Sequence, residues 1–225
     1  MTTFALTRSP DPLVADVILR DITRAALAPF DLDPTIETKF YPWEMPEEIP
    51  LVTDFGIGLI VGASGSGKSQ LLSRFGKPSS PRWYPREALA EHFDSAEEAT
   101  EKFYAVGLNT VPVWRLPYDV LSNGQKFRAD LARSIGHASV IDEFTSVVDR
   151  NVAVSASRAL RGYVTRKGIF GMVLASCHRD VIPWLMPDWV IDTDAGTFTI
   201  GDVEEAPRWF AEHLTGDAVG RLVLA

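Results

Sequence analysis

The segment GASGSGKS at residues 62–69 constrains the fold of this chain more than any other feature. It follows the apolar run FGIGLIVG and precedes a helical pattern at residues 66–75, so a strand, a glycine loop and a helix are expected in that order. Two glycines followed by Lys and Ser at this spacing match a phosphate-binding loop, whose backbone N–H groups wrap a phosphate. The expected cofactor contacts are Gly62, Ser64, Gly65, Gly67, Lys68, Ser69 and Gln70, with Lys68 neutralising phosphate oxygens and Ser69 holding Mg²⁺.

Strand and helix patterns alternate along the rest of the chain. Helices are predicted at residues 13–28, 94–107 (capped by Asp94 or Ser95 and stopped by Gly107), from Ser122 onward, and at 151–168. Buried strands are predicted within residues 138–144 and 169–178, a short strand at 34–43, and a hairpin at 188–200. Such alternation predicts an α/β fold with a mainly parallel sheet and flanking helices.

Two carboxylates end the predicted strand SVIDE. Asp142 is placed to reach Mg²⁺ through water, and Glu143 can polarise an attacking water as a general base. An Asp-Glu pair alone is more often a solvated strand end. Downstream of a phosphate loop, the catalytic interpretation is favoured.

The stretch LSNGQ starts the helix at Ser122. Ser122 and Gln125 form a capping-box pattern, which a plain helix start would explain. A helix N-terminus with Gly124 in its first turn is also a ready anion site. The residues alone leave both interpretations open.

Composition bounds the class of protein. The chain has 225 residues, 46% of them hydrophobic, and a net charge of −8, enough for one sizeable core. Cys177 is the single cysteine, which excludes an internal disulfide and indicates a reducing compartment. No signal-like segment opens the chain, and no apolar run approaches the roughly 20 residues of a membrane span. A soluble, cytoplasmic protein without a membrane span is expected, and its acidity argues against broad coating of nucleic acid.

In their residues and in their order along the chain, these motifs resemble those of the ATP-binding-cassette (ABC) ATPases over roughly residues 36–198. LSNGQKFRADLARSI resembles the family's signature motif and helix, with Asn123 where glycine is usual. VIDEFTSVVD resembles its Walker B strand, catalytic glutamate and D-loop, with Phe144 in place of proline. LASCHRD resembles the segment that carries the switch histidine, which makes His178 that residue.

The resemblance implies a P-loop NTPase core of ABC type that works as a head-to-tail homodimer with two ATP molecules and Mg²⁺ between the protomers. Glu143 and His178 would be catalytic, and Ser69 and Asp142 would hold the metal. Contacts from the other protomer would come from Ser122, Gly124, Gln125 and, in the D-loop, Asp149. Either Tyr41 or Trp43 would stack on adenine, and Tyr41 is taken as the candidate.

The chain departs from the family in its linking segment. Its only glutamines are Gln70 and Gln125, so the Q-loop glutamine is missing, with Asp94 and Glu87 as candidate replacements. Because about fifty residues separate Ser69 from Ser122, the helical subdomain is expected to be reduced, to about residues 78–136. A single domain over 1–225 is expected, with an N-terminal extension at 1–35 and a C-terminal extension at 199–225.

These features predict a soluble ATPase of the compact, non-transporter branch that drives a separate partner protein. FDLDP and SGSGKSQLL resemble a group associated with acetyltransferase-like domains, which makes such a protein a candidate partner. The alternatives are the nucleotide-binding subunit of a transporter and an ATP-gated DNA-binding scaffold. A P-loop kinase for a small substrate is disfavoured, because such an enzyme does not need the LSNGQ segment. The basic and aromatic stretch at residues 74–86 suits a nucleic acid, or else it is an irregular loop with its aromatic side chains packed inward.

Overall fold

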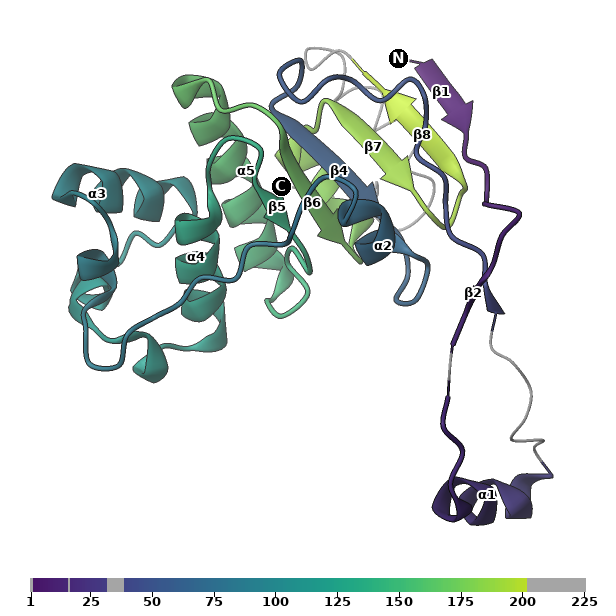
Figure 1. Ribbon diagram of the computed structural model, residues 1–225. Coiled ribbons are helices and arrows are strands. Elements are labelled where there is room, and N and C mark those ends of the chain that lie inside the picture. The colour runs from purple at the N-terminus through teal and green to yellow at the C-terminus, as the bar shows by residue number, and fades with distance from the viewer. Residues whose placement is uncertain (1, 16, 32–38, 202–225) are drawn as a thin grey trace.

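A six-stranded sheet organises the computed structural model, which describes residues 2–15, 17–31 and 39–201. The strand order is β1-β8-β7-β4-β6-β5 (Figure 1). The strands of this sheet are β1 Thr2–Ala5, β4 Ile57–Val61, β5 Val140–Ile141, β6 Met172–Ser176, β7 Trp189–Asp192 and β8 Thr197–Ile200. Strands β5, β6, β4 and β7 run parallel, whereas β8 and β1 extend the sheet in antiparallel fashion. The expected α/β fold with a mainly parallel sheet is confirmed.

Helices cover both faces of the sheet (Figure 1). The α-helices are α1 Asp21–Leu27, α2 Lys68–Leu72, α3 Ala96–Ala105, α4 Asn123–Ser134, α5 Arg150–Lys167 and α6 Ile182–Leu185. The 3₁₀ helices are η1 Ala28–Phe30, η2 Leu89–His92, η3 Val111–Arg115, η4 Tyr118–Val120 and η5 Arg179–Val181. A two-stranded ribbon, β2 Leu13–Val14 with β3 Lys39–Phe40, lies outside the main sheet.

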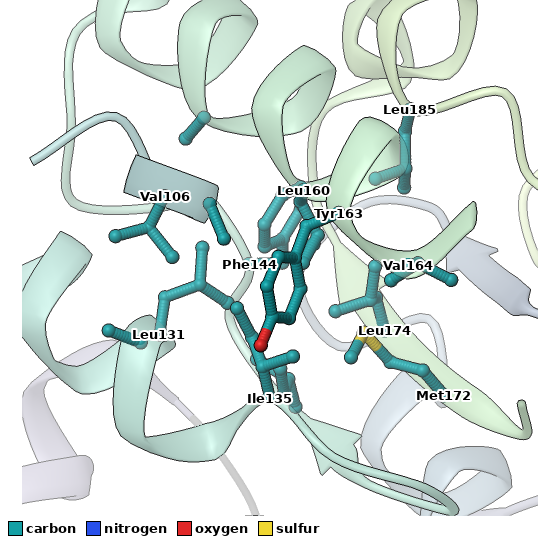
Figure 2. Packing of buried hydrophobic residues seen from close by; sticks show 14 of the residues in the cluster. Val106, Leu131, Ile135, Phe144, Leu160, Tyr163, Val164, Met172, Leu174 and Leu185 are labelled. Atoms are coloured by element: carbon teal, nitrogen blue, oxygen red, sulfur yellow. The ribbon is translucent and has the colours of Figure 1, made fainter. Parts of the chain in front are cut away.

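The core has two parts because successive side chains of a strand point to opposite faces. All five residues of β4 are buried. Leu59 and Val61 join a cluster with α3, α4, α5 and α6, part of which Figure 2 shows around Phe144. Ile60 joins the other cluster, with residues of α2 and β7. This two-sided burial explains why β4 reads as an unbroken apolar run.

Local capping signals set the helix ends as expected. Ser95, rather than Asp94, caps α3 by accepting a hydrogen bond from Glu98 N at 3.1 Å. Gly107 and Gly168 follow α3 and α5 with φ of +72° and +60°, conformations that glycine adopts without strain. The capping box of α4 is present and is described with the site below.

Other boundaries differ from the prediction. The helix predicted at residues 13–28 is wrong over its first half, since Leu13–Val14 form β2 and α1 begins at Asp21. No residue of α1 is buried, so its apolar spacing is not the core-facing pattern from which the longer helix was inferred. The helix predicted at 66–75 is confined to Lys68–Leu72, and β1 was not foreseen.

Parts of four predicted segments lie outside the described residues. These parts are residue 16 of the helix at 13–28, residues 34–38 of the short strand, residues 1, 16 and 32–35 of the N-terminal extension, and residues 202–225 of the C-terminal extension. Within the described residues, no helix combines the length and the apolar character that crossing a membrane requires.

Gly58 is predicted to be essential to the packing of β4. A Cβ atom at Gly58 would lie 2.0 Å from Cζ2 of the buried Trp189, whereas a Cβ at Gly136 would meet nothing within 4 Å. Gly58→Ala should therefore lower the free energy of unfolding by about 1–3 kcal/mol or more, as overpacking does. Gly136→Ala, the matched control, should change it by less than about 1 kcal/mol. Equal denaturant midpoints for the two variants would show that this contact does not constrain the sheet.

Candidate nucleotide-binding site

The segment Gly62–Ser69 turns sharply between β4 and α2. Gly65 and Gly67 have φ of +78° and +102°, in the region that favours glycine. A Cβ at Gly67 would come within 2.9 Å of Cζ of Phe40, and Gly65 faces open space. A loop with several glycines at positive φ turns successive N–H groups toward one concavity, which is a geometry for holding an anion.

Lys68 lies inside this loop. Its side chain is buried, and Nζ donates a hydrogen bond to the carbonyl of Ala63 at 2.7 Å. Ser64 and Ser69, the other polar members predicted to contact a nucleotide, are exposed. Gln70 differs from them because its Oε1 is buried without a hydrogen-bond partner among the described residues. The loop thus presents one ammonium group and two accessible hydroxyl groups.

An ion-pair cluster that sequence reasoning missed supports the loop from β7. Asp194 accepts hydrogen bonds from Ala63 N at 2.9 and 3.0 Å. Arg179 donates to both carboxylate oxygens of Asp192 at 2.6 and 2.7 Å, and to Asp194 at 3.0 Å. The hydrogen bond with Asp192 is the main cause that raises the pKa of Arg179. Burial favours a higher pKa for Asp192, yet the hydrogen bonds from Arg179 and the backbone outweigh it and lower that pKa.

Asp142 and Glu143 follow β5 at the same edge of the sheet, as predicted. Glu143 is exposed and has a φ of +54°, a strained conformation for a residue with a side chain. Its N–H donates to Asp142 Oδ1 at 2.8 Å, and Ser146 Oγ donates to Glu143 Oε2. The turn therefore orients the two carboxylates separately, and one hydroxyl group fixes the direction of Glu143.

His178 follows β6, one strand away. Its N–H donates to Ser176 Oγ at 3.0 Å, and Nδ1 lies 3.4 Å from Oγ1 of the buried Thr145. Thr145 belongs to the turn after Glu143, so its hydroxyl group connects His178 to the turn that carries Glu143. Burial, and then the charge of Arg150, lower the pKa of His178. The imidazole is consequently neutral at neutral pH.

The predicted signature residues lie elsewhere. Ser122 Oγ accepts from Gln125 N at 3.4 Å, and Gln125 Oε1 accepts from Ser122 N at 3.0 Å, which completes the capping box. Ser122 is exposed and Gly124 half-buried. Figure 1 shows α4 on the far side of β5 and β6 from α2. The structure therefore does not bring Ser122 to the phosphate loop of its own chain.

Two further predicted contacts have distinct environments. Asp149 caps α5, because its Oδ1 accepts from the N–H groups of Asn151 and Val152 at 3.0 Å. Trp43 is buried and donates from Nε1 to Ser66 O at 2.9 Å, so it supports the phosphate loop from beneath. Tyr41 is 45% exposed. Of the two aromatic candidates, Tyr41 is the one with an accessible ring.

A cavity of about 520 Å³ separates the start of α4 from the end of β5. Its lining includes Ser79, Ser80, Asn123, Asp142 and Glu143. The candidate replacements for the Q-loop glutamine do not line this cavity. Instead, Oε2 of Glu87 lies 3.7 Å from Nε2 of His92. The backbone N–H of Asp94 donates a hydrogen bond to Oε2 of Glu98.

The aromatic residues of the basic segment 74–86 are engaged within the protein. The Trp83 ring stacks on Tyr118 at 5.1 Å and donates from Nε1 to Asp130 at 2.7 Å. Arg133 lies 5.1 Å from the centre of the same ring. Tyr84, although 61% exposed, stacks on His92. The inward-packed interpretation is confirmed for Trp83, whose ring contacts Tyr118, His92 and Arg133 within the protein.

Among the described residues, no group of three or more His, Cys, Asp or Glu side chains is arranged to hold a metal ion. The exposed hydroxyl of Ser69 and the carboxylate of Asp142 are oxygen donors. Mg²⁺ is commonly held by one or two such groups together with substrate phosphates and water. The donor set therefore fits Mg²⁺ that arrives with a nucleotide.

The lowered pKa of His178 makes stability depend on pH in a defined direction. At pH values between the folded-state pKa and the ordinary 6.5, the unfolded chain binds more protons at this residue, so the free energy of unfolding falls as the pH falls. The effect is absent well above pH 6.5. Denaturant titrations across this range should show a weaker decrease for His178→Gln than for wild type. The exposed His137 provides the control substitution, His137→Gln, and an equal effect of both substitutions would refute the environment described for His178.

Comparison with known proteins found relatives only among solved structures, since no protein-family model and no curated protein matches the chain. A metal-chelate-type ABC transporter in an inward-facing conformation is 17% identical, with a TM-score of 0.51, and the match covers 74% of this chain and 78% of that one. The ATP-binding cassette MJ0796, a dimer in a post-hydrolysis state bound to ADP and Pi, is 14% identical, with a TM-score of 0.50, and the match covers 83% and 93%.

Sequence identities this low establish similarity of fold, and the activity must be inferred from the residues of the site. Neither structure is described with an acetyltransferase, so that part of the expectation gains no support. The order of loop, carboxylates and histidine along the sheet edge agrees with the expected P-loop core. This chain has the fold of the ABC ATPase cassettes.

Proposed function

We propose that this protein is an ABC-type ATPase that binds Mg-ATP at Gly62–Ser69 and hydrolyses it between two head-to-tail protomers, thereby driving a separate partner protein. One observation carries the proposal. The phosphate loop, the Asp142–Glu143 pair and His178 follow neighbouring strands at one edge of the sheet, whereas α4 lies on the far side of β5 and β6 from α2, and a cavity separates its capped start from Asp142 and Glu143. A second protomer supplies the missing half of the site.

Each group at the edge has a task that its environment supports. Lys68 and the N–H groups of the loop bind the β- and γ-phosphates, and Ser69 and Asp142 hold the metal. Bound Mg²⁺ neutralises charge that develops on the phosphate oxygens. Glu143, aimed by Ser146, accepts a proton from the attacking water. Neutral His178 can donate one hydrogen bond to the phosphate while its other nitrogen faces Thr145.

The partner protomer contributes a helix N-terminus. In α4 the capping box uses the N–H groups of Ser122 and Gln125, which leaves those of Asn123 and Gly124 directed along the helix axis. Unpaired N–H groups at the start of a 12-residue helix bind anions. Exposure of Ser122 is consistent with docking on a γ-phosphate held by the other chain.

A transporter subunit is the second candidate, favoured by the likeness to a transporter structure. The short connection between α2 and α4, which lacks a Q-loop glutamine, disfavours it because this region would receive the membrane subunit. Co-purification with a polytopic membrane protein would decide for the transporter subunit. The ATP-gated DNA scaffold has less support, because the ring of Trp83 already stacks on Tyr118 and contacts Arg133.

Glu143→Gln should retain ATP binding but reduce turnover by roughly 10²–10⁴-fold, since only the general base is lost. Lys68→Ala should instead abolish binding, because the ammonium group inside the loop is removed. Titration with a fluorescent ATP analogue and a phosphate-release assay measure the two properties. A parallel loss of ATP affinity in Glu143→Gln would contradict the role assigned to this residue.

Mixing two inactive variants should restore activity. Ser122→Arg places a bulky cation where the partner's phosphate docks, and Lys68→Ala destroys the phosphate loop, so neither variant forms a working site with itself. A heterodimer contains one intact site, made of the loop from the Ser122→Arg chain and the helix start from the Lys68→Ala chain. Partial ATPase activity in the mixture is expected, provided that one filled site suffices. Full ATPase activity of Ser122→Arg alone would show that α4 does not serve the site.

A further inference from the structure

The described residues between Leu13 and Phe30, here called the arm, lie apart from the body of the protein (Figure 1). Six large apolar side chains of the arm are between 49% and 84% exposed, namely Leu13, Val14, Val17, Ile18, Ile22 and Phe30. No residue of α1 is buried. Soluble proteins seldom leave so much apolar surface uncovered unless it binds something.

Helix α1 lacks the means to be stable by itself. It has seven residues, and Arg20 at its N-cap provides no side-chain hydrogen bond. Isolated helices shorter than roughly 12–15 residues are marginal in water, and most helical stability in proteins comes from packing of an apolar face. The folding free energy of α1 must therefore come from a surface that its apolar side chains cover.

The arm is rooted in the phosphate loop. Arg8 bridges the backbone of Trp43, and its guanidinium group lies 3.8 Å from the centre of the Trp43 ring. Trp43 in turn donates to Ser66 O at 2.9 Å. The chain enters the arm after Arg8 and returns from it before Trp43, so the arm extends from the edge of the sheet where a nucleotide binds.

We propose that the arm clasps a second copy of this chain in the head-to-tail dimer, an inference that rests on the proposed function. In that dimer the partner's Ser122 faces the phosphate loop, at the root of the arm. Two exposed apolar side chains accompany the signature serine, Val120 at 64% and, in the D-loop, Val147 at 65%. The arm and these valines supply apolar contacts that the polar nucleotide site lacks, and homodimer interfaces are typically more apolar than the remaining surface.

The charges of the arm agree with this occupant. Residues 13–30 contain two arginines and two aspartates, so the arm is neutral and approaches a copy of net charge −8 without repulsion. Helices that lie on anionic membranes are rich in Lys and Arg on their polar face. A second copy of the chain therefore suits the arm better than a lipid surface does.

Clasping by the arms predicts a dimer that forms without nucleotide. Sedimentation velocity of the full chain at micromolar concentration tests this with two neighbouring substitutions on α1. Ile22→Glu removes an apolar side chain, whereas Thr23→Glu adds the same charge at an exposed polar position. Neither substitution lowers helix propensity.

Wild type and Thr23→Glu should be dimeric without nucleotide. Ile22→Glu should raise the dissociation constant by roughly 100-fold or more, because the dimer loses two buried isoleucine side chains, each worth about tenfold or more. Hydrogen exchange should protect the amides of residues 21–27 only in the dimeric forms.

The clasp by the arm and the composite nucleotide site can be refuted independently of each other. Glu143→Gln combined with Ile22→Glu should still dimerise when Mg-ATP is added, because the nucleotide sites remain. A lack of that dimer would contradict the composite site. A wild-type protein that is monomeric without nucleotide, or equal dissociation constants for Ile22→Glu and Thr23→Glu, would overturn the clasp.

Discussion

The parallel pairing of β4 with β6 and β7 brings three segments of the candidate site to one edge of the sheet. Val61 is in register with Ser176 on one side and with Asp192 on the other. Parallel strands present their carboxyl ends at one edge, so the segments after these three residues must meet there. They are the phosphate loop, the turn that carries His178 and the turn that carries Asp194.

Arginine–aspartate pairs tie these strand-end segments together. Arg179 joins the segment after β6 to the turn after β7, and Asp194 passes the connection to Ala63 in the phosphate loop. Arg150, at the start of α5, makes a two-point contact with Asp180 at 2.7 and 2.8 Å. Two-point arginine–carboxylate contacts are directional as well as attractive. A displacement at His178 is thereby connected both to the loop and to the D-loop, which ends where α5 begins.

Much of the site could be predicted from the sequence because its signals are local. The glycines before Lys68, the capping box at Ser122 and the strand that ends at Asp142 each depend on residues within a few positions. The Arg179–Asp192 pair had no such signal, since it requires knowing that β7 lies beside β4. The adenine candidates were equivalent in sequence for the same reason, and the burial of Trp43 together with its contact with Ser66 separates it from the exposed Tyr41.

The errors have physical causes of the same kind. The helix expected at residues 13–28 rested on apolar spacing, which indicates a buried face only when a core exists to bury it. No side chain of α1 is buried within this chain, so the spacing there does not mark a core-facing surface, and we propose that a second copy of the chain covers it. Asp94 and Glu87 stay candidates for metal sensing by residue type; neither lines the cavity at Glu143, whose lining includes Ser79 and Ser80.

The most direct test of the composite site is a crystal structure of the Glu143→Gln protein with Mg-ATP. Each ATP should be held by Lys68 of one protomer and by the start of α4, at Ser122 and Gly124, of the other. Two nucleotides should lie between two head-to-tail chains. A nucleotide contacted by a single chain, with both α4 N-termini exposed to solvent, would contradict the proposed division of the site between protomers.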